Sequence, residues 1–208
     1  KPFRGVTMFD ARTMEWTRPP QKAQVTKSRV LFETEPHTDL WQRTYYHFRN
    51  DSAPVLQFKT CEKFFSFTVK AQFDYRRRFD QAGVALYLGS DSWLKGSIEY
   101  EDGRICRLGA VVTNRGYSDW SSTDISPVRE MWFRLSRRED DFCIENSEDG
   151  VIFHQMRIAH MFDLPEEISL GIYACSPEES SFEAVFTDLQ LTECKWRAHD
   201  GQPPDAEA

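Results

Sequence analysis

The sequence predicts an all-β protein, an antiparallel two-sheet β-sandwich, on three observations. Apolar and polar side chains alternate along several segments, turn residues separate these segments at strand-like spacing, and 208 residues suit one domain. A chain of this length buries about 70% of the surface that its unfolded form exposes, so it needs no disulfide or metal to be stable. We expect the sandwich to span residues 1–198 and residues 199–208, which are polar and acidic, to form a disordered tail.

Three segments show most clearly the alternation of a half-buried strand. The residues expected to face the core are Phe65, Phe67, Val69, Ala71 and Phe73 in the first, Met131, Phe133 and Leu135 in the second, and Phe182, Ala184 and Phe186 in the third. In the third segment, Leu189 and Leu191 continue the apolar face only if a bulge shifts the phase. A single short helix is expected around Arg157 to Phe162, ended by Pro165.

A β-hairpin is expected where Asp102-Gly103 separates two strand-like runs, 93–101 and 104–114. A two-residue type I′ turn there would set Glu99 opposite Cys106. That register mixes polar and apolar residues on one face of the sheet. Either a bulge shifts the register by one residue or the face is a semi-polar groove, and the sequence leaves both interpretations open.

Composition excludes several classes of function. With 33 acidic and 26 basic residues the formal charge is -7, which disfavours nucleic acid as a partner. No apolar stretch approaches the ~18 residues needed to span a membrane. The five cysteines are scattered, with no CxxC pair and no metal-ligand spacing, so we expect no cofactor, no metal and a reducing, cytoplasmic location. The oligomeric state is not determined by the sequence.

The first candidate ligand site lies on one predicted strand, where Trp93, Lys95 and Glu99 alternate onto the same face. An aromatic ring beside a cation and a carboxylate suits a polyhydroxylated ligand, with Trp93 stacking, Lys95 donating and Glu99 accepting. Gln81 would add a donor, and Asp119 an acceptor, beside Trp120. The structural alternatives are an ordinary sheet face with a cross-strand ion pair, and a turn in which the tryptophan plugs the end of the sandwich.

Asp39, Trp41 and His47 form a second candidate group, in which His47 is the general acid or base because imidazole titrates near neutrality. A purely structural histidine is the alternative. Glu99 and Glu101 also have the spacing of a carboxylate pair flanking a glycosidic bond, although Glu101 abuts the expected turn.

Six short motifs make the chain resemble the regulation-of-enolase family of concanavalin-A-like domains, a family catalogued as a domain of unknown function. They are Thr38 to Trp41, Asp80 to Gly83, Trp93 to Lys95 with Glu99, Val111 to Thr113, Ser118 to Ser121, and Gly171 to Pro177. The resemblance covers roughly residues 10 to 195 and implies a jelly roll with a concave face. The last motif contributes Tyr173 to the predicted ligand-binding residues.

Three functions are consistent with these observations. The leading hypothesis is a module whose concave, aromatic-lined groove binds a saccharide or another oxygen-rich small molecule. The second is a lyase, isomerase, cyclase or hydrolase that uses Glu99, His47 or Asp119 in the same groove. The third is a regulatory module that binds another protein through an exposed apolar patch.

Overall fold

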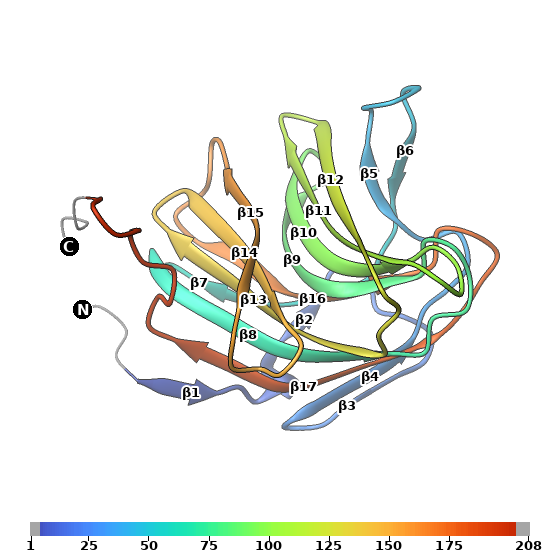
Figure 1. The fold of residues 1–208 in the computed structure, drawn as a ribbon, viewed down its shortest axis with the longest axis horizontal. Helices are drawn as coiled ribbons and strands as arrows, with labels where there is room; N and C mark the ends of the chain where they lie inside the picture. The colour runs from blue at the N-terminus through green and yellow to red at the C-terminus, as the bar shows by residue number, and fades with distance from the viewer. Residues whose placement is uncertain (1–4, 203–208) are drawn as a thin grey trace.

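The computed structural model describes residues 5–202, and it is an antiparallel β-sandwich (Figure 1). The eight-stranded sheet has the order β15-β14-β13-β8-β17-β4-β3, with β1 also paired to β17. Its strands are β1 Val6–Met8, β3 Ala23–Val25, β4 Arg29–Glu33, β8 Phe64–Phe73, β13 Glu130–Arg138, β14 Asp141–Ser147, β15 His154–His160 and β17 Glu183–Thr192. A short 3-10 turn, η1, covers Ala11–Thr13.

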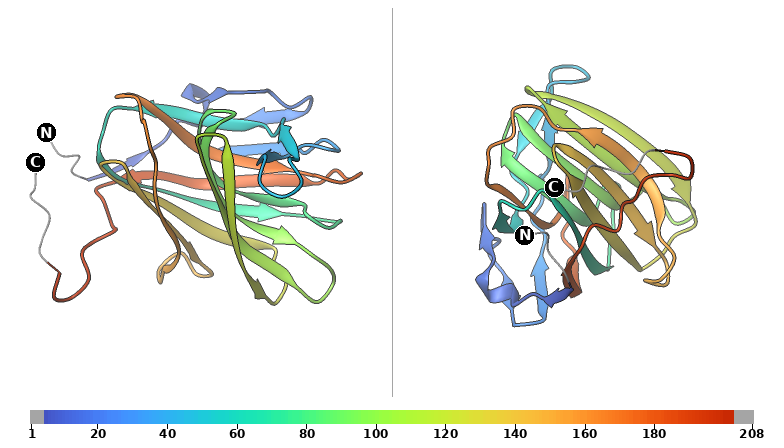
Figure 2. Two further views of the ribbon diagram at one scale, coloured as in Figure 1. Left: turned by 90° about the horizontal axis from the view of Figure 1, so that it is seen from above. Right: turned by 90° about the vertical axis from the view of Figure 1, so that its left-hand side faces the viewer.

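The seven-stranded sheet has the order β12-β11-β10-β9-β16-β7-β2. Its strands are β2 Glu15–Trp16, β7 Val55–Thr60, β9 Gln81–Gly89, β10 Ser92–Tyr100, β11 Cys106–Asn114, β12 Tyr117–Ile125 and β16 Ile168–Cys175. A separate hairpin, β5 Leu40–Gln42 with β6 Arg49–Asp51, stands beside β9–β12 (Figure 1). Figure 2 shows from two further directions how β9–β12 curve across the eight-stranded sheet.

The core between the sheets confirms the alternation expected from sequence. Phe65, Phe67, Val69 and Ala71 are fully buried, and Phe73 is nearly so. The inward-facing residues of β13 and β17 predicted from sequence are also buried: Met131, Phe133, Leu135, Ala184 and Phe186. The expected phase shift in β17 is present, because its register with β8 breaks between Thr187 and Gln190 and leaves Leu189 buried.

The expected helix around Arg157 to Phe162 is wrong. Residues 157–160 belong to strand β15, which pairs with β14 so that Ile158 lies opposite Cys143. A helix of one or two turns gains little from its own hydrogen bonds, whereas the exposed edge of β14 offers the same backbone groups ready partners.

The hairpin after β10 also differs from the expected two-residue turn. Tyr100 pairs with Cys106 and Glu99 with Arg107, so residues 101–105 form the loop and the register moves by one residue. The Asp102 Oδ1 atom accepts bonds from the backbone amides of Arg104 and Ile105, at 2.7 and 3.1 Å, which favours this longer loop. The moved register separates the two faces: Cys106 is buried in the core, and Glu99 lies on the outer face.

The segment that follows β17 returns along the eight-stranded sheet at the end of the molecule remote from hairpin β5–β6 (Figure 1). Within it the amide of Gln202 donates to the carbonyl of His199 at 3.0 Å, so residues 199–202 form a turn. Residues 203–208 lie outside the described residues, and the disorder expected for the tail stays a prediction.

Candidate functional site

The outer face of the seven-stranded sheet carries the candidate site. Lys95 lies in a cross-strand row between Ala85 and Val111, and Glu99 lies in another between Gln81 and Arg107. Above them is a groove of about 1230 Å³. Its lining residues are Asp39, Trp41, Thr44, Tyr45, Tyr46, Phe48, Arg78, Phe79, Gln81, Lys95, Glu99, Arg107, Val111, Ser118, Asp119, Trp120, Pro177 and Glu178.

A network of hydrogen bonds forms the polar floor of the groove. Lys95 Nζ donates to Asp39 Oδ1 at 3.0 Å and to Gln81 Oε1 at 2.9 Å. The Tyr173 hydroxyl donates to the same Gln81 oxygen at 2.8 Å, and Gln81 Nε2 donates to Glu99 Oε2 at 3.3 Å. Asp39, which precedes β5, thus joins a floor that is otherwise built from β9, β10 and β16. Four of the residues predicted from sequence are brought together with Glu99 in one network.

The charge of Lys95 is maintained although the side chain is only 4% exposed. Burial is the largest single effect and opposes the charged form, but the nearby acidic groups together, with Asp39 first among them, outweigh it and leave the pKa of Lys95 above its ordinary value. The ammonium also lies 5.7 Å from the ring centre of Trp93 and 5.6 Å from that of Tyr173, where the faces of aromatic rings attract cations. A buried cation that two acceptors hold in this way is a fixed donor with one N–H left over.

Glu99 has the opposite electrostatics. Burial raises its pKa to about 7, and Lys95 and Arg107 only partly offset this effect. Its Oε1 atom is buried and has no hydrogen-bond partner within the described part of the chain. Glu99 is therefore divided between its neutral and charged forms near neutrality, which suits it to gaining or losing a proton there.

Two tryptophans predicted from sequence meet above the floor. Trp41 and Trp120 contact edge to face with ring centres 6.3 Å apart, and the Trp41 indole donates to the carbonyl of Thr44 at 2.6 Å. Trp120 remains 45% exposed. It lies beside Gly109, where a Cβ would be 3.4 Å from the Trp120 indole nitrogen, in van der Waals contact. The groove thus has an aromatic wall that a ring-shaped ligand can contact.

The structure does not support a stacking role for Trp93. Only 1% of this residue is exposed, and it packs with Leu40, Val55 and Tyr173 in a small apolar cluster beneath the floor. Its indole donates to the carbonyl of Ser90 at 3.0 Å. Strand alternation places it correctly on the outer face, but the segment from residue 40 to 55 covers it.

Four other sequence candidates do not occupy the positions that their expected roles require. His47 is exposed at the tip of hairpin β5–β6 and does not line the groove. Asp119 lines the groove but is ion-paired with Arg157 at 2.5 Å. Glu101 is held by Arg78 and Arg107, both at 3.0 Å, so the pairing with Glu99 considered for glycoside hydrolysis is not formed. Tyr173 is buried and reaches the groove only through Gln81.

Sequence reasoning missed several groove residues, notably Phe79, Arg107 and Val111. Arg107 and Val111 were obscured by the register error, because the expected hairpin turned the opposite face of β11 outwards. Phe79 lies in a loop, where no periodic pattern applies. Among the described residues, no group of three or more His, Cys, Asp or Glu side chains could hold a metal ion.

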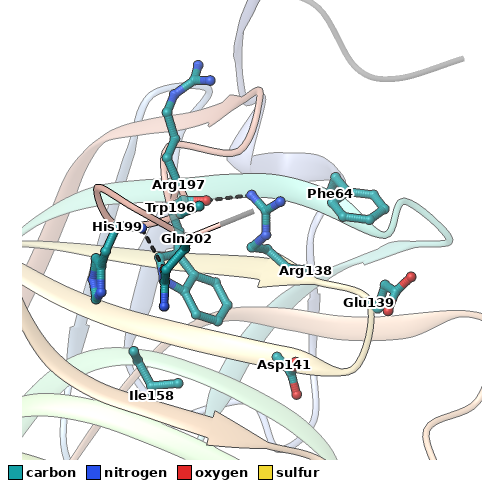
Figure 3. A pocket seen from close by; sticks show the side chains of 10 residues that line it. Phe64, Arg138, Glu139, Asp141, Ile158, Trp196, Arg197, His199 and Gln202 are labelled. Carbon is teal, nitrogen blue, oxygen red and sulfur yellow. Dashed lines mark hydrogen bonds between the residues drawn. The ribbon is translucent and has the colours of Figure 1, made fainter. Parts of the chain in front are cut away.

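A smaller hollow of about 530 Å³ lies at the other end of the molecule (Figure 3). It is bounded by Phe64, residues 138–141, Ile158 and the turn at 196–202, with Arg138 donating to the carbonyl of Trp196 at 2.6 Å. It contains none of the candidate residues and is closed by the chain's own C-terminal segment. The groove is the better candidate site.

Fold and site together define an antiparallel two-sheet β-sandwich whose outer sheet face carries a polar floor beside tryptophan walls. The chain belongs to the family described as "Protein of unknown function (DUF1349)", which matches residues 16–194. It is 32% identical over 178 residues to "Regulation of enolase protein 1" of Saccharomyces cerevisiae, covering 85% of this chain and 88% of that protein. The resemblance found in the sequence is thereby confirmed.

Solved structures agree on the fold. A functionally unknown protein from Saccharomyces cerevisiae superposes with a TM-score of 0.81 at 30% identity, covering 88% of this chain and 98% of that one. A GH43 protein of Bacillus licheniformis superposes with a TM-score of 0.68 over 92% of this chain and 39% of its own, at 16% identity, which shows the fold alone. Within residues 5–202 there is no helix long and apolar enough to cross a membrane.

Proposed function

We propose that the groove binds a saccharide or a similar oxygen-rich small molecule, and that the protein is a ligand-binding module. The observation that carries this proposal is the paired arrangement of Lys95 and Glu99 on the floor. A lysine ammonium has three N–H donors, and Asp39 and Gln81 occupy two of those on Lys95. A vicinal diol would supply one hydroxyl to the third N–H and one to the unpartnered Glu99 Oε1, which is buried in this structure and would meet the ligand once the Glu99 side chain turns towards the groove.

Aromatic walls support the same ligand class. The C–H groups on one face of a sugar ring pack on an aromatic face, while the hydroxyls at its edge seek polar groups. Trp120 is 45% exposed and lies opposite Val111, in the cross-strand row that also contains Lys95. Gln81, whose amide is used within the floor network, positions Lys95 and Glu99 in this account.

A second candidate function is an enzyme of the acid/base type. Glu99 favours it, because a carboxyl whose pKa is about 7 can both accept and donate a proton at neutral pH. A single proton transfer is sufficient for a lyase, an isomerase or a cyclase. Such an enzyme would use the same groove, so the two functions predict the same ligand contacts and differ only in turnover.

A thermal-shift screen of mono- and oligosaccharides and of hydroxylated metabolites tests the proposal. We expect hits whose stabilisation is lost in Trp120→Ala and reduced in Glu99→Gln, but kept in Trp132→Ala, which removes a tryptophan outside the groove. NMR spectra of each hit incubated with wild type and Glu99→Gln then separate the candidates: new signals with wild type alone indicate an enzyme. If no compound stabilises the wild type, or if Trp120→Ala responds as wild type does, the proposal is wrong.

We further propose a reducing location such as the cytoplasm. All five cysteines are free, and Cys61 is exposed. Alkylation in denaturant immediately after cell lysis should modify all five thiols; protection of any pair until a reductant is added would contradict this location.

A further inference from the structure

The tip of hairpin β5–β6 has an unusual backbone. Arg43, Tyr45, Tyr46 and His47 all have φ between 56° and 66°, in the left-handed region that side chains with a Cβ rarely adopt. None of them is a glycine. Backbone conformations of this kind persist only where surrounding structure enforces them, and they concentrate at ligand clamps and functional sites.

Contacts from Gln42 and Arg43, where the chain enters the tip, fasten it to neighbouring segments. The Arg43 guanidinium donates to the carbonyl of Gly116 at 2.9 Å and to Asp91 at 3.3 Å. The backbone amide of Gln42 donates to Ser118 Oγ at 2.9 Å, and its side chain to the carbonyl of Ser90 at 3.0 Å. The hairpin is thus fastened to the turn before β10 and to the start of β12, and it forms a fixed wall.

This fixed wall presents aromatic side chains to solvent. Tyr45 is 75% exposed, Tyr46 83% and Phe48 51%, yet all three line the groove. The two tyrosine rings contact each other edge to face with centres 4.3 Å apart. The groove therefore has an inner zone, with the polar floor and the two tryptophans, and an outer zone that is almost purely aromatic.

Charge on the groove wall is balanced pair by pair. Each of its three cations already has a carboxylate partner: Lys95 pairs with Asp39, Arg78 with Glu101, and Arg107 with both Glu101 and Asp124. A ligand carboxylate or phosphate would find no cation without a partner among the described lining residues. A neutral ligand needs no free cation, so these ion pairs do not weaken its binding.

From these observations we propose that the groove takes a neutral oligosaccharide, with one sugar ring on the polar floor and the following rings against Tyr45, Tyr46 and Phe48. The inference rests on the proposed function and extends it, because it specifies the charge and the length of the ligand. The outer zone adds contacts that a single ring on the floor cannot reach.

Isothermal titration with neutral gluco- and xylo-oligosaccharides of one to five rings, and with uronic acid oligomers of the same lengths, tests this inference. In the wild type we expect affinity for at least one neutral series to rise about tenfold or more between one ring and four, and the uronate series to bind more weakly. In the double variant Tyr45→Ser/Tyr46→Ser the increase with length should be lost, while affinity for the single ring stays unchanged. Both residues are exposed, so this variant should keep its fold, and Phe162→Ser provides an exposed aromatic control outside the groove.

The outcomes separate this inference from the proposed function. If neutral saccharides bind with the same affinity at every length, or if the tyrosine double variant keeps the full length dependence, the outer zone has no role although the floor binds sugar. Tighter binding of uronates than of neutral oligomers would overturn the charge argument. If no saccharide of any length binds, the proposed function fails together with the inference.

Discussion

Replacement of Glu99 by glutamine tests the electrostatics of the floor directly. Because the pKa of Glu99 rises from an ordinary 4.5 to about 7 on folding, the native state holds a proton that the unfolded state releases between these values. Protein stability therefore falls as pH rises through this window. At about 1.4 kcal/mol for each pH unit, the wild type loses about 3 kcal/mol by pH 8, an upper estimate because Glu99 is only partly buried.

Glutamine is close in shape to the neutral acid, and its oxygen can still accept the bond from Gln81 Nε2. We therefore expect Glu99→Gln to match the wild type near pH 4.5 and to be up to about 3 kcal/mol more stable at pH 8. Urea unfolding of both proteins at half-unit steps from pH 4.5 to 8 measures the difference. Parallel stability curves, or a wild type that gains on the variant as pH rises, would show that Lys95 stabilises the charged form and that the reasoning is wrong.

Three further changes probe the floor and walls. Lys95→Met leaves the Asp39 carboxylate without its partner and should lower the free energy of unfolding in urea by about 3 kcal/mol. The double variant Lys95→Met/Asp39→Asn should recover part of this loss of stability. If the losses of the two single variants are additive instead, the two residues are not coupled. Trp93→Ala should cost about 3–5 kcal/mol because the side chain is fully packed, and a near-neutral effect would return it to the surface role first expected. Gly109→Val should displace the Trp120 indole and weaken saccharide binding about tenfold in titration calorimetry with little change in stability; unchanged affinity would mean that the indole does not contact the ligand.

Much of the fold could be predicted because strand alternation is a local property. Phe65 and Phe67 had to share a face once the segment was extended, and so did Lys95 and Glu99. The two wrong predictions, the helix around Ile158 and the two-residue hairpin turn, failed because contacts outside the local pattern determined the structure. The segment around Ile158 became a strand because β14 offered an edge, and the loop after β10 was set by the side-chain bonds of Asp102.

The same distinction applies to the candidate site. Sequence period placed Lys95 on the outer face, but its partner Asp39 lies 56 residues earlier, a contact that no spacing rule predicts. Trp93 was predicted wrongly for the same reason, because its contacts also come from distant parts of the sequence. The sequence predicted the correct sheet face for Trp93 but not its burial, because the residues that bury it include Leu40 and Val55. The neutral-range pKa of Glu99 depends on burial in the same way.

The strand order constrains how the molecule can assemble. The strands in the middle of each sheet have one pairing partner that comes late in the sequence. The partner of β9 is β16, and that of β8 is β17. During synthesis both keep an open edge until the last quarter of the sequence has emerged, and such edges invite pairing between chains. The contact of Tyr173 with Gln81 is made at the same moment, so the floor of the groove is completed only when the sandwich closes, and a nascent chain stopped before β16 would be prone to aggregate.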